Sequence, residues 1–153
     1  MQGGVFRSIF SPDGMLEITI EDNIIVITAQ GPWNIEYLDN LHQKLLWAIT
    51  QVDLSNYAIL ITPKGEAISV EAGLAYHLKF IRQGTTKAVA LNLADCTTSQ
   101  LTEYLFTKIY QAAGIKHAFF DNVFDARLWL EKELKNPVTD ASRTNIQHSS
   151  DNK

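Results

Sequence analysis

Apolar and polar residues follow two different periods along this chain. Residues 15–20 alternate, with Leu16, Ile18 and Ile20 on one side and polar residues between them. A second, β-branched run at residues 24–29 follows after a short polar reversal. A period of two is typical of half-buried strands, so the two runs predict an antiparallel hairpin.

From residue 35 the period becomes helical. Asn34 is placed to cap this helix, and apolar residues recur every three or four positions at Ile35, Leu38, Leu41, Leu45, Leu46, Ile49 and Val52. The same reasoning predicts further helices from Ser69 to about Gln83, from Thr98 or Ser99 to Gly114, and from Asp121 or Asn122 to about residue 135. Continuous apolar runs predict buried strands at 57–61, 87–93 and 117–120.

The predicted order is β-β-α-β-α-β-α-β-α. Right-handed crossovers make the last four strands parallel and the first one antiparallel to them. We therefore expect one α/β domain over residues 15–135, with a mixed, mostly parallel five-stranded sheet and four helices. Residues 1–14 form an N-terminal segment, and the polar residues 136–153 are expected to be a disordered tail.

Composition narrows the classes of function. The formal net charge is -4 and the pI about 5.5, so there is no overall basic field and no nucleic-acid partner is expected. Cys96 is the single cysteine, which excludes an intrachain disulfide and a zinc site built on several thiolates. The chain has no apolar run near the roughly 20 residues of a membrane span. These features favour a cytoplasmic protein.

Several segments between residues 15 and 135 carry a family resemblance. They are Leu16–Ile20, Ile24–Ala29 with the closing Gly31-Pro32-Trp33, Ala58–Ile61, Ser69–Leu74 and Phe124–Leu130. Together they resemble the STAS domain of bacterial anti-sigma factor antagonists, and especially its SpoIIAA-like relatives. The resemblance implies a non-enzymatic bacterial signalling module that binds a protein partner.

The resemblance also concerns a regulatory turn. In the anti-sigma factor antagonists the helix after the third strand opens with an Asp-Ser-Ser-Gly-type turn, in which one serine is phosphorylated. If Gly73-Leu74 matches that turn, the phosphorylated position falls on Glu71 or Ala72, neither of which has a hydroxyl. Ser69 is the nearest serine. We therefore expect no switching by phosphorylation at this turn, with Ser69 acting as a helix cap.

The candidate chemistry elsewhere is sparse. His42, His77, His117 and His148 have no metal-ligand spacing, and the pattern favours surface or boundary histidines. Cys96 lies between a strand and a helix, where a thiol can be activated, but no histidine is placed by sequence to act as its base. An inert, partly buried thiol is the favoured interpretation.

Two further hypotheses concern loops that follow predicted strands: an anion site and a cluster of carboxylates. Pro63-Lys64-Gly65-Glu66 follows a strand and could hold an anion, although it lacks the glycine spacing of a phosphate-binding loop. Glu66, Glu71 and Asp95 could meet at the carboxyl ends of neighbouring strands and act as acids, bases or cation ligands. Capping and solvation explain these carboxylates equally well.

The sequence thus predicts a partner-binding surface at the starts of the second and third helices. Its residues are Glu66, Ser69, Glu71, Asp95, Thr97 and Thr98; no catalytic residue, metal or cofactor is predicted. The alternative is a small enzyme or carrier of a small apolar ligand, with a pocket between helices and sheet. An enclosed pocket would favour that alternative, whereas a packed core with exposed apolar side chains favours a protein partner. The sequence also leaves open whether the chain forms a homodimer.

Overall fold

The structure, a computed structural model, describes residues 5–10, 14–31, 33–66 and 71–136. Its elements are β1 (Val5–Phe10), β2 (Gly14–Glu21), β3 (Ile24–Gln30), α1 (Ile35–Ala48), a 3-10 turn η1 (Ile49–Gln51), β4 (Ala58–Pro63), α2 (Glu71–Ile81), β5 (Ala88–Asn92), α3 (Ser99–Ala113), β6 (Lys116–Phe120) and α4 (Val123–Lys135). The five predicted strands and four predicted helices are all present in the predicted order, so the predicted fold class is confirmed.

The strand count needs one correction. Residues 5–10, placed by the sequence pattern in an N-terminal segment, form a sixth strand that pairs antiparallel with β2. The first helix also ends earlier than its apolar stripe suggests, because the backbone tightens into η1 after Ala48. Ser69 and the tail from residue 137 lie outside the described residues.

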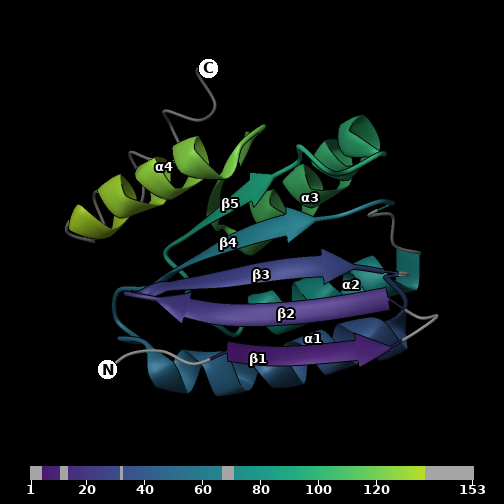
Figure 1. Cartoon of the computed structure of the whole chain (residues 1–153), viewed down its shortest axis with the longest axis horizontal. Coiled ribbons are helices and arrows are strands. Elements are labelled where there is room, and N and C mark those ends of the chain that lie inside the picture. Colours follow the sequence, from purple (N-terminus) through teal and green to yellow (C-terminus); the bar gives the residue numbers. More distant parts are fainter. Residues whose placement is uncertain (1–4, 11–13, 32, 67–70, 137–153) are drawn as a thin grey trace.

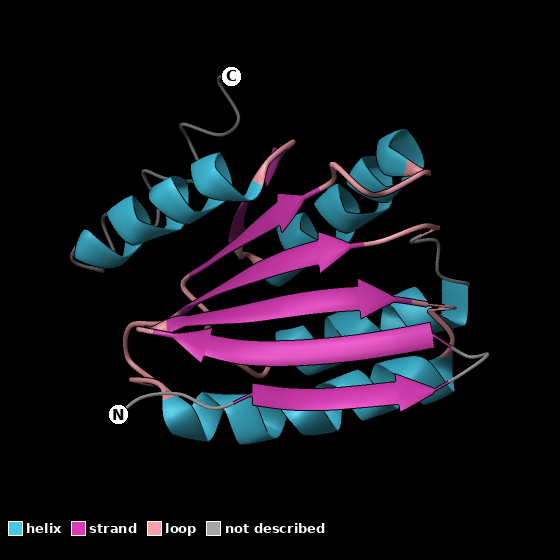
Figure 2. Cartoon of the chain, viewed as in Figure 1, coloured by secondary structure: helices cyan, strands magenta, loops and turns pink. Residues whose placement is uncertain are grey.

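The six strands stand in sequence order across one sheet. β2 pairs antiparallel with β3, whereas β3, β4, β5 and β6 are parallel to one another. The helices α1, α2 and α3 cover one face of this sheet and α4 covers the other (Figures 1 and 2). The carboxyl ends of β3, β4, β5 and β6 therefore meet at one edge, where α1, α2 and α3 begin.

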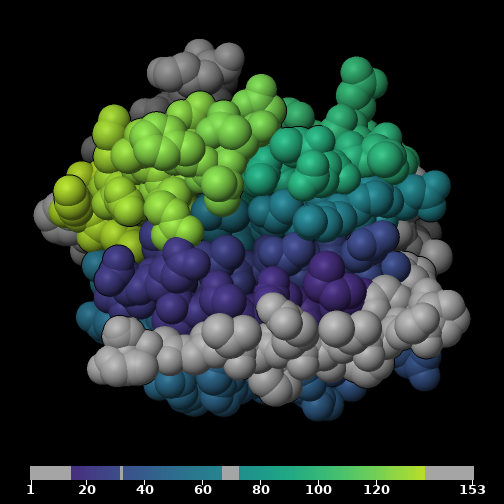
Figure 3. Space-filling model, viewed as in Figure 1, coloured from purple at the N-terminus to yellow at the C-terminus, as the bar shows by residue number. Residues whose placement is uncertain are grey.

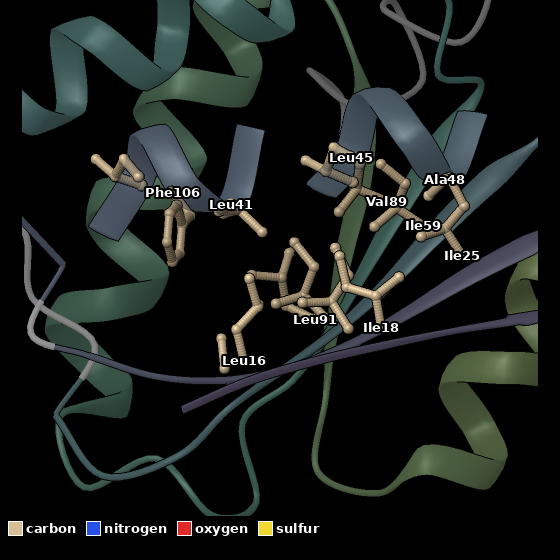
Figure 4. Packing of buried hydrophobic residues seen from close by; sticks show 14 of the residues in the cluster. Leu16, Ile18, Ile25, Leu41, Leu45, Ala48, Ile59, Val89, Leu91 and Phe106 are labelled. Carbon is tan, nitrogen blue, oxygen red and sulfur yellow. The ribbon is translucent and has the colours of Figure 1, made fainter. Parts of the chain in front are cut away.

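The larger core lies between the sheet and helices α1, α2 and α3. Leu41 and Leu45 of α1 and Phe106 of α3 point toward sheet residues such as Ile59 and Leu91 (Figure 4). Asn34 caps α1, since its Oδ1 accepts a hydrogen bond from the Tyr37 amide at 2.8 Å. Leu38, Leu41 and Leu45 of the predicted stripe are thus buried against the sheet, whereas Ile35 and Leu46 of the same stripe are exposed.

The core on the opposite face is built on small residues. The sheet presents Ala58, Ala88 and Ala90 to α4, which returns Ala126 and Leu130; all five are fully buried. Alanine lets the helix approach the sheet closely. In Figure 3, α4 leaves β2 and β3 visible beside it, so this second layer covers part of its face.

Candidate functional site

The loops after β4 and β5 lie side by side at the carboxyl edge of the sheet. We call residues 64–66 and 95–98 the carboxyl-end face. The Gly65 amide donates to the Asp95 carbonyl at 3.0 Å, and the Thr97 amide donates to the Gly65 carbonyl at 2.9 Å. This pairing forms an isolated parallel bridge between Gly65 and Cys96, beyond the ends of β4 and β5. The two loops therefore form one hydrogen-bonded unit.

Gly65 makes this arrangement possible. Its φ is +66°, in the left-handed region that L side chains rarely adopt. The turn at this residue lets both its amide and its carbonyl reach the neighbouring loop. Lys64 anchors the other side, because its amide donates to the Ala29 carbonyl at 2.8 Å. The loop is thus held to β3 as well as to the loop after β5.

The structure places the predicted binding residues in three ways. Glu66, Asp95 and Thr97 are exposed on the carboxyl-end face. Thr98 belongs to the same loop but is half-buried, and its hydroxyl lies 3.1 Å from the Thr102 hydroxyl. Glu71 is the first residue of α2, and Ser69 lies outside the described residues. The loops therefore bring together two carboxylates and one hydroxyl, facing solvent.

Cys96 lies beneath this surface. It is buried, and its Sγ is 3.4 Å from the Thr102 hydroxyl and 3.7 Å from that of Thr98. Threonine hydroxyls are not bases at neutral pH, so these contacts satisfy a thiol without activating it. The geometry supports the interpretation of Cys96 as a packing residue.

The first turns of α3 add apolar side chains next to the loop. Leu101 is 43% exposed and Tyr104 59% exposed. They are three residues apart in α3, so they lie on the same side of the helix. The Lys108 ammonium lies 5.3 Å from the centre of the Tyr104 ring. The helix thus continues the carboxyl-end face with an apolar and aromatic strip.

A histidine pair is the feature that the sequence did not reveal. His42 of α1 and His77 of α2 are both buried, and their ring nitrogens Nε2 and Nδ1 are 2.8 Å apart. The prediction of separate surface or boundary histidines is wrong for these two. Their separation of 35 residues hides the contact, which depends on how α1 packs against α2.

A small cavity lies beside His77. Apolar residues of the sheet and of α1, α2 and α3 line it, together with Thr86 and Tyr110. Its volume is about 30 Å³, which is room for little more than a water molecule. Burial raises the pKa of Tyr110 well above its usual value of 10. The Tyr110 phenol, in the wall of the cavity, therefore stays un-ionised.

Comparison with known proteins identifies the architecture. A crystal structure of an uncharacterized protein of the DUF3478 family from Shewanella loihica PV-4, described as having a SpoIIAA-like fold, superposes with a TM-score of 0.53 at 18% sequence identity. The match covers 85% of this chain and 96% of that one. This protein has a SpoIIAA-like fold. The carboxyl-end face, α2 and α3 therefore belong to a SpoIIAA-like framework, as the resemblance implied.

The sequence comparisons add no further assignment. The protein-family models and the curated proteins give no match to this chain. Within the described part of the SpoIIAA-like fold, no helix is long and apolar enough to cross a bilayer. No group of three or more His, Cys, Asp or Glu side chains in that part is arranged to hold a metal ion.

Proposed function

We propose that this protein is a STAS-like regulatory module that binds a protein partner through its carboxyl-end face and the adjoining first turns of α3. The SpoIIAA-like fold supports the regulatory class, since the resemblance implied such a module. The module acts by binding and carries out no chemistry.

One observation carries this proposal. Backbone hydrogen bonds between Gly65, Asp95 and Thr97 join the two loops into a single surface. A surface that is ordered before binding loses less conformational entropy on association than separate flexible loops do. Because the two loops have a fixed arrangement, they are suited to binding a protein partner.

The side chains on this surface indicate the kind of partner. Glu66 and Asp95 present two exposed carboxylates, and Leu101 and Tyr104 present apolar area beside them. Tyrosine at the centre of an interface often contributes strongly to binding, and carboxylates at its rim favour a basic partner. We infer a partner segment that combines Lys or Arg with an apolar anchor.

Among the described residues, the size of the cavity beside His77 argues against a carrier of a small apolar ligand. Ligand pockets typically measure roughly 300–1,000 Å³. The cavity beside His77, at about 30 Å³, is an order of magnitude smaller. A packed core with exposed Leu101 and Tyr104 favours the partner-binding interpretation.

A pull-down with matched variants tests the proposal. The immobilised native chain and the variant Asp95→Lys/Tyr104→Ser are incubated with extract of the source cells, and retained proteins are quantified by mass spectrometry. The matched control is Glu131→Lys/Leu128→Ser, which makes the same kind of change at exposed positions of α4.

The expected result is a protein retained by the native chain and the control but reduced at least about tenfold with the site variant, because each lost anchor weakens binding by roughly 1 kcal/mol or more. Equal retention by all three chains would contradict the proposed surface. Circular dichroism of each variant checks that the fold is intact.

A further inference from the structure

The contact between α1 and α2 is centred on two histidines that share one hydrogen bond. His42 and His77 approach through Nε2 and Nδ1 at 2.8 Å, with their rings only 15° from parallel. His77 is 5% exposed and His42 4%. In a neutral pair one nitrogen donates and the other accepts, so the bond needs one proton between them.

Two aromatic side chains of α2 stack on the His42 ring. Phe80 of α2 stacks on it at a centroid distance of 3.9 Å, with the planes 1° apart. Tyr76 stacks at 5.2 Å, and its hydroxyl donates to the Asp39 carboxylate of α1 at 2.7 Å. This arrangement makes the α1–α2 interface a cluster of aromatic and titratable side chains.

The charged and titratable groups that face the pair are few among the described residues. α1 contributes Asp39 and α2 contributes Tyr76, whereas α3 contributes Tyr110, which lines the cavity next to His77. The sheet contributes to that cavity Ile27, Ile59, Ile61 and Val89, which carry no charge. Asp39 is thus the one described carboxylate placed to favour a cation here.

Protonation affects this contact directly. One added proton leaves a donor and an acceptor, so the hydrogen bond persists. A second proton leaves two donors facing each other at 2.8 Å, with no acceptor between them and two like charges in an apolar interior. The doubly protonated pair is therefore incompatible with the observed contact.

We propose that the His42–His77 contact is an acid-sensitive latch, which holds α2 against α1 when the pair is neutral and releases α2 when both imidazoles are protonated. α2 begins at Glu71, five residues after Glu66. Release therefore moves the helix that follows the loop after β4. The latch is a property of the α1–α2 interface and is tested without any partner.

The pKa values agree in direction with the geometry. Burial, with a further contribution from the neighbouring His42, lowers the pKa of His77 to about 3. Burial also lowers the pKa of His42, which stays at about 4 because Asp39 acts in the opposite direction. The released histidines titrate near 6.5, so the open form binds more protons below that pH. Acid therefore favours release, from about pH 6.5 down to the lowered pKa values.

Hydrogen–deuterium exchange of the full chain at pH 7.0 and 5.0, corrected for intrinsic exchange rates, measures this release. Each histidine shifts the open fraction by up to tenfold per pH unit, so protection of α2 amides should fall at least about tenfold between these two pH values. Protection of α4, which packs on the opposite face and contains no histidine, should change far less.

Two variants isolate the pair. His42→Gln/His77→Asn places amides near Nε2 and Nδ1, which can keep a hydrogen bond that does not titrate, so its α2 protection should not depend on pH. His117→Asn is the matched control, because burial also lowers the pKa of this histidine, which lies on β6; here the pH response of α2 should remain. A pH response that persists in the double variant, or α2 protection in the native chain as insensitive to pH as that of α4, overturns the proposal.

A measurement on the native chain covers the case in which the double variant fails to fold. The imidazole C–H resonances of His42 and His77 are followed by NMR from pH 7 to 5. The proposal expects no titration of either ring in the closed state. A midpoint near 6.5 for either ring, with α2 still protected, overturns it.

Discussion

At the scale of single residues, the Cys96 thiol shows how a potentially reactive group is kept inert. It lies in the loop between β5 and α3, three residues before the helix begins. The thiol is buried, and its described hydrogen-bonding contacts are the hydroxyls of Thr98 and Thr102. Reagents must therefore wait for the loop to open before they reach the sulfur.

We predict slow modification of Cys96 by a thiol reagent in the native protein near neutral pH, and complete modification in urea. The variant Cys96→Ala should bind the same partner as the native chain, with a loss of about 1 kcal/mol in unfolding free energy from the lost thiol contacts. The absorbance of the group that the thiol reagent releases measures the rate of modification. Urea denaturation measures the change in unfolding free energy. Rapid modification at pH 6 would restore the nucleophile hypothesis.

A second residue-scale prediction concerns the turn before α2. A carboxylate near a helix N-terminus is stabilised as a phosphate would be, although more weakly, and the first residue of α2 is Glu71. We expect no stoichiometric phosphate at Ser69, and we expect Ser69→Ala to cost about 1 kcal/mol as a lost cap. Phosphosite mapping after incubation with the cell's own kinases decides the first point. Phosphorylation of Ser69 that changes partner binding would contradict the expectation that this turn is not a phosphorylation switch.

At the scale of elements, the seating of α4 depends on small side chains. The α4 residues Ala126 and Leu130 pack against three small side chains of the sheet, Ala58, Ala88 and Ala90. Lys116 of β6 adds an ion pair at 2.9 Å to Glu133, a buried carboxylate of α4. Asn122 caps the other end, where its Oδ1 accepts from the Asp125 amide at 2.7 Å. The helix is thus fixed at both ends and along its length.

The variant Ala90→Leu should destabilise the fold by about 1–3 kcal/mol, because the added methylenes have no space between β5 and α4. Ala112→Leu is the matched control, since Ala112 is exposed on α3 and should tolerate the change within about 0.5 kcal/mol. Urea denaturation followed by circular dichroism compares them. Equal stability of the two variants would mean that α4 can shift without cost.

The sequence predicts the elements well where a side-chain period decides them. α1, α3 and the strand β2 are examples, because their buried faces require regular apolar spacing, and the continuous apolar runs of β4 and β5 are just as clear. β1 escapes such reasoning: Arg7 and Ser8 interrupt its apolar residues, and it is held by backbone pairing with β2. The loop contact at Gly65 and the pair of His42 and His77 depend on tertiary packing, which no local period records.

At the scale of the whole molecule, stability should reside in residues 5–136. The segment 137–153 is rich in Ser, Thr, Asn and Asp and contains few large apolar side chains, so its composition predicts that it buries little apolar area. Deleting it should change the melting temperature by no more than a few degrees, as measured by differential scanning calorimetry. A drop of many degrees would show that this segment packs against the domain.

The strictly sequential order of β1 to β6 also bears on synthesis by the ribosome. Each strand pairs with the strand that was synthesised just before it, so the sheet can form as the chain emerges. This arrangement also keeps the contact order low. α4 is the exception, since it is made after the six described strands and it covers Ala58, Leu60, Ala88 and Ala90. Until α4 emerges, a nascent chain exposes that apolar face, so chaperone binding should concentrate in the interval between completion of β5 and completion of α4.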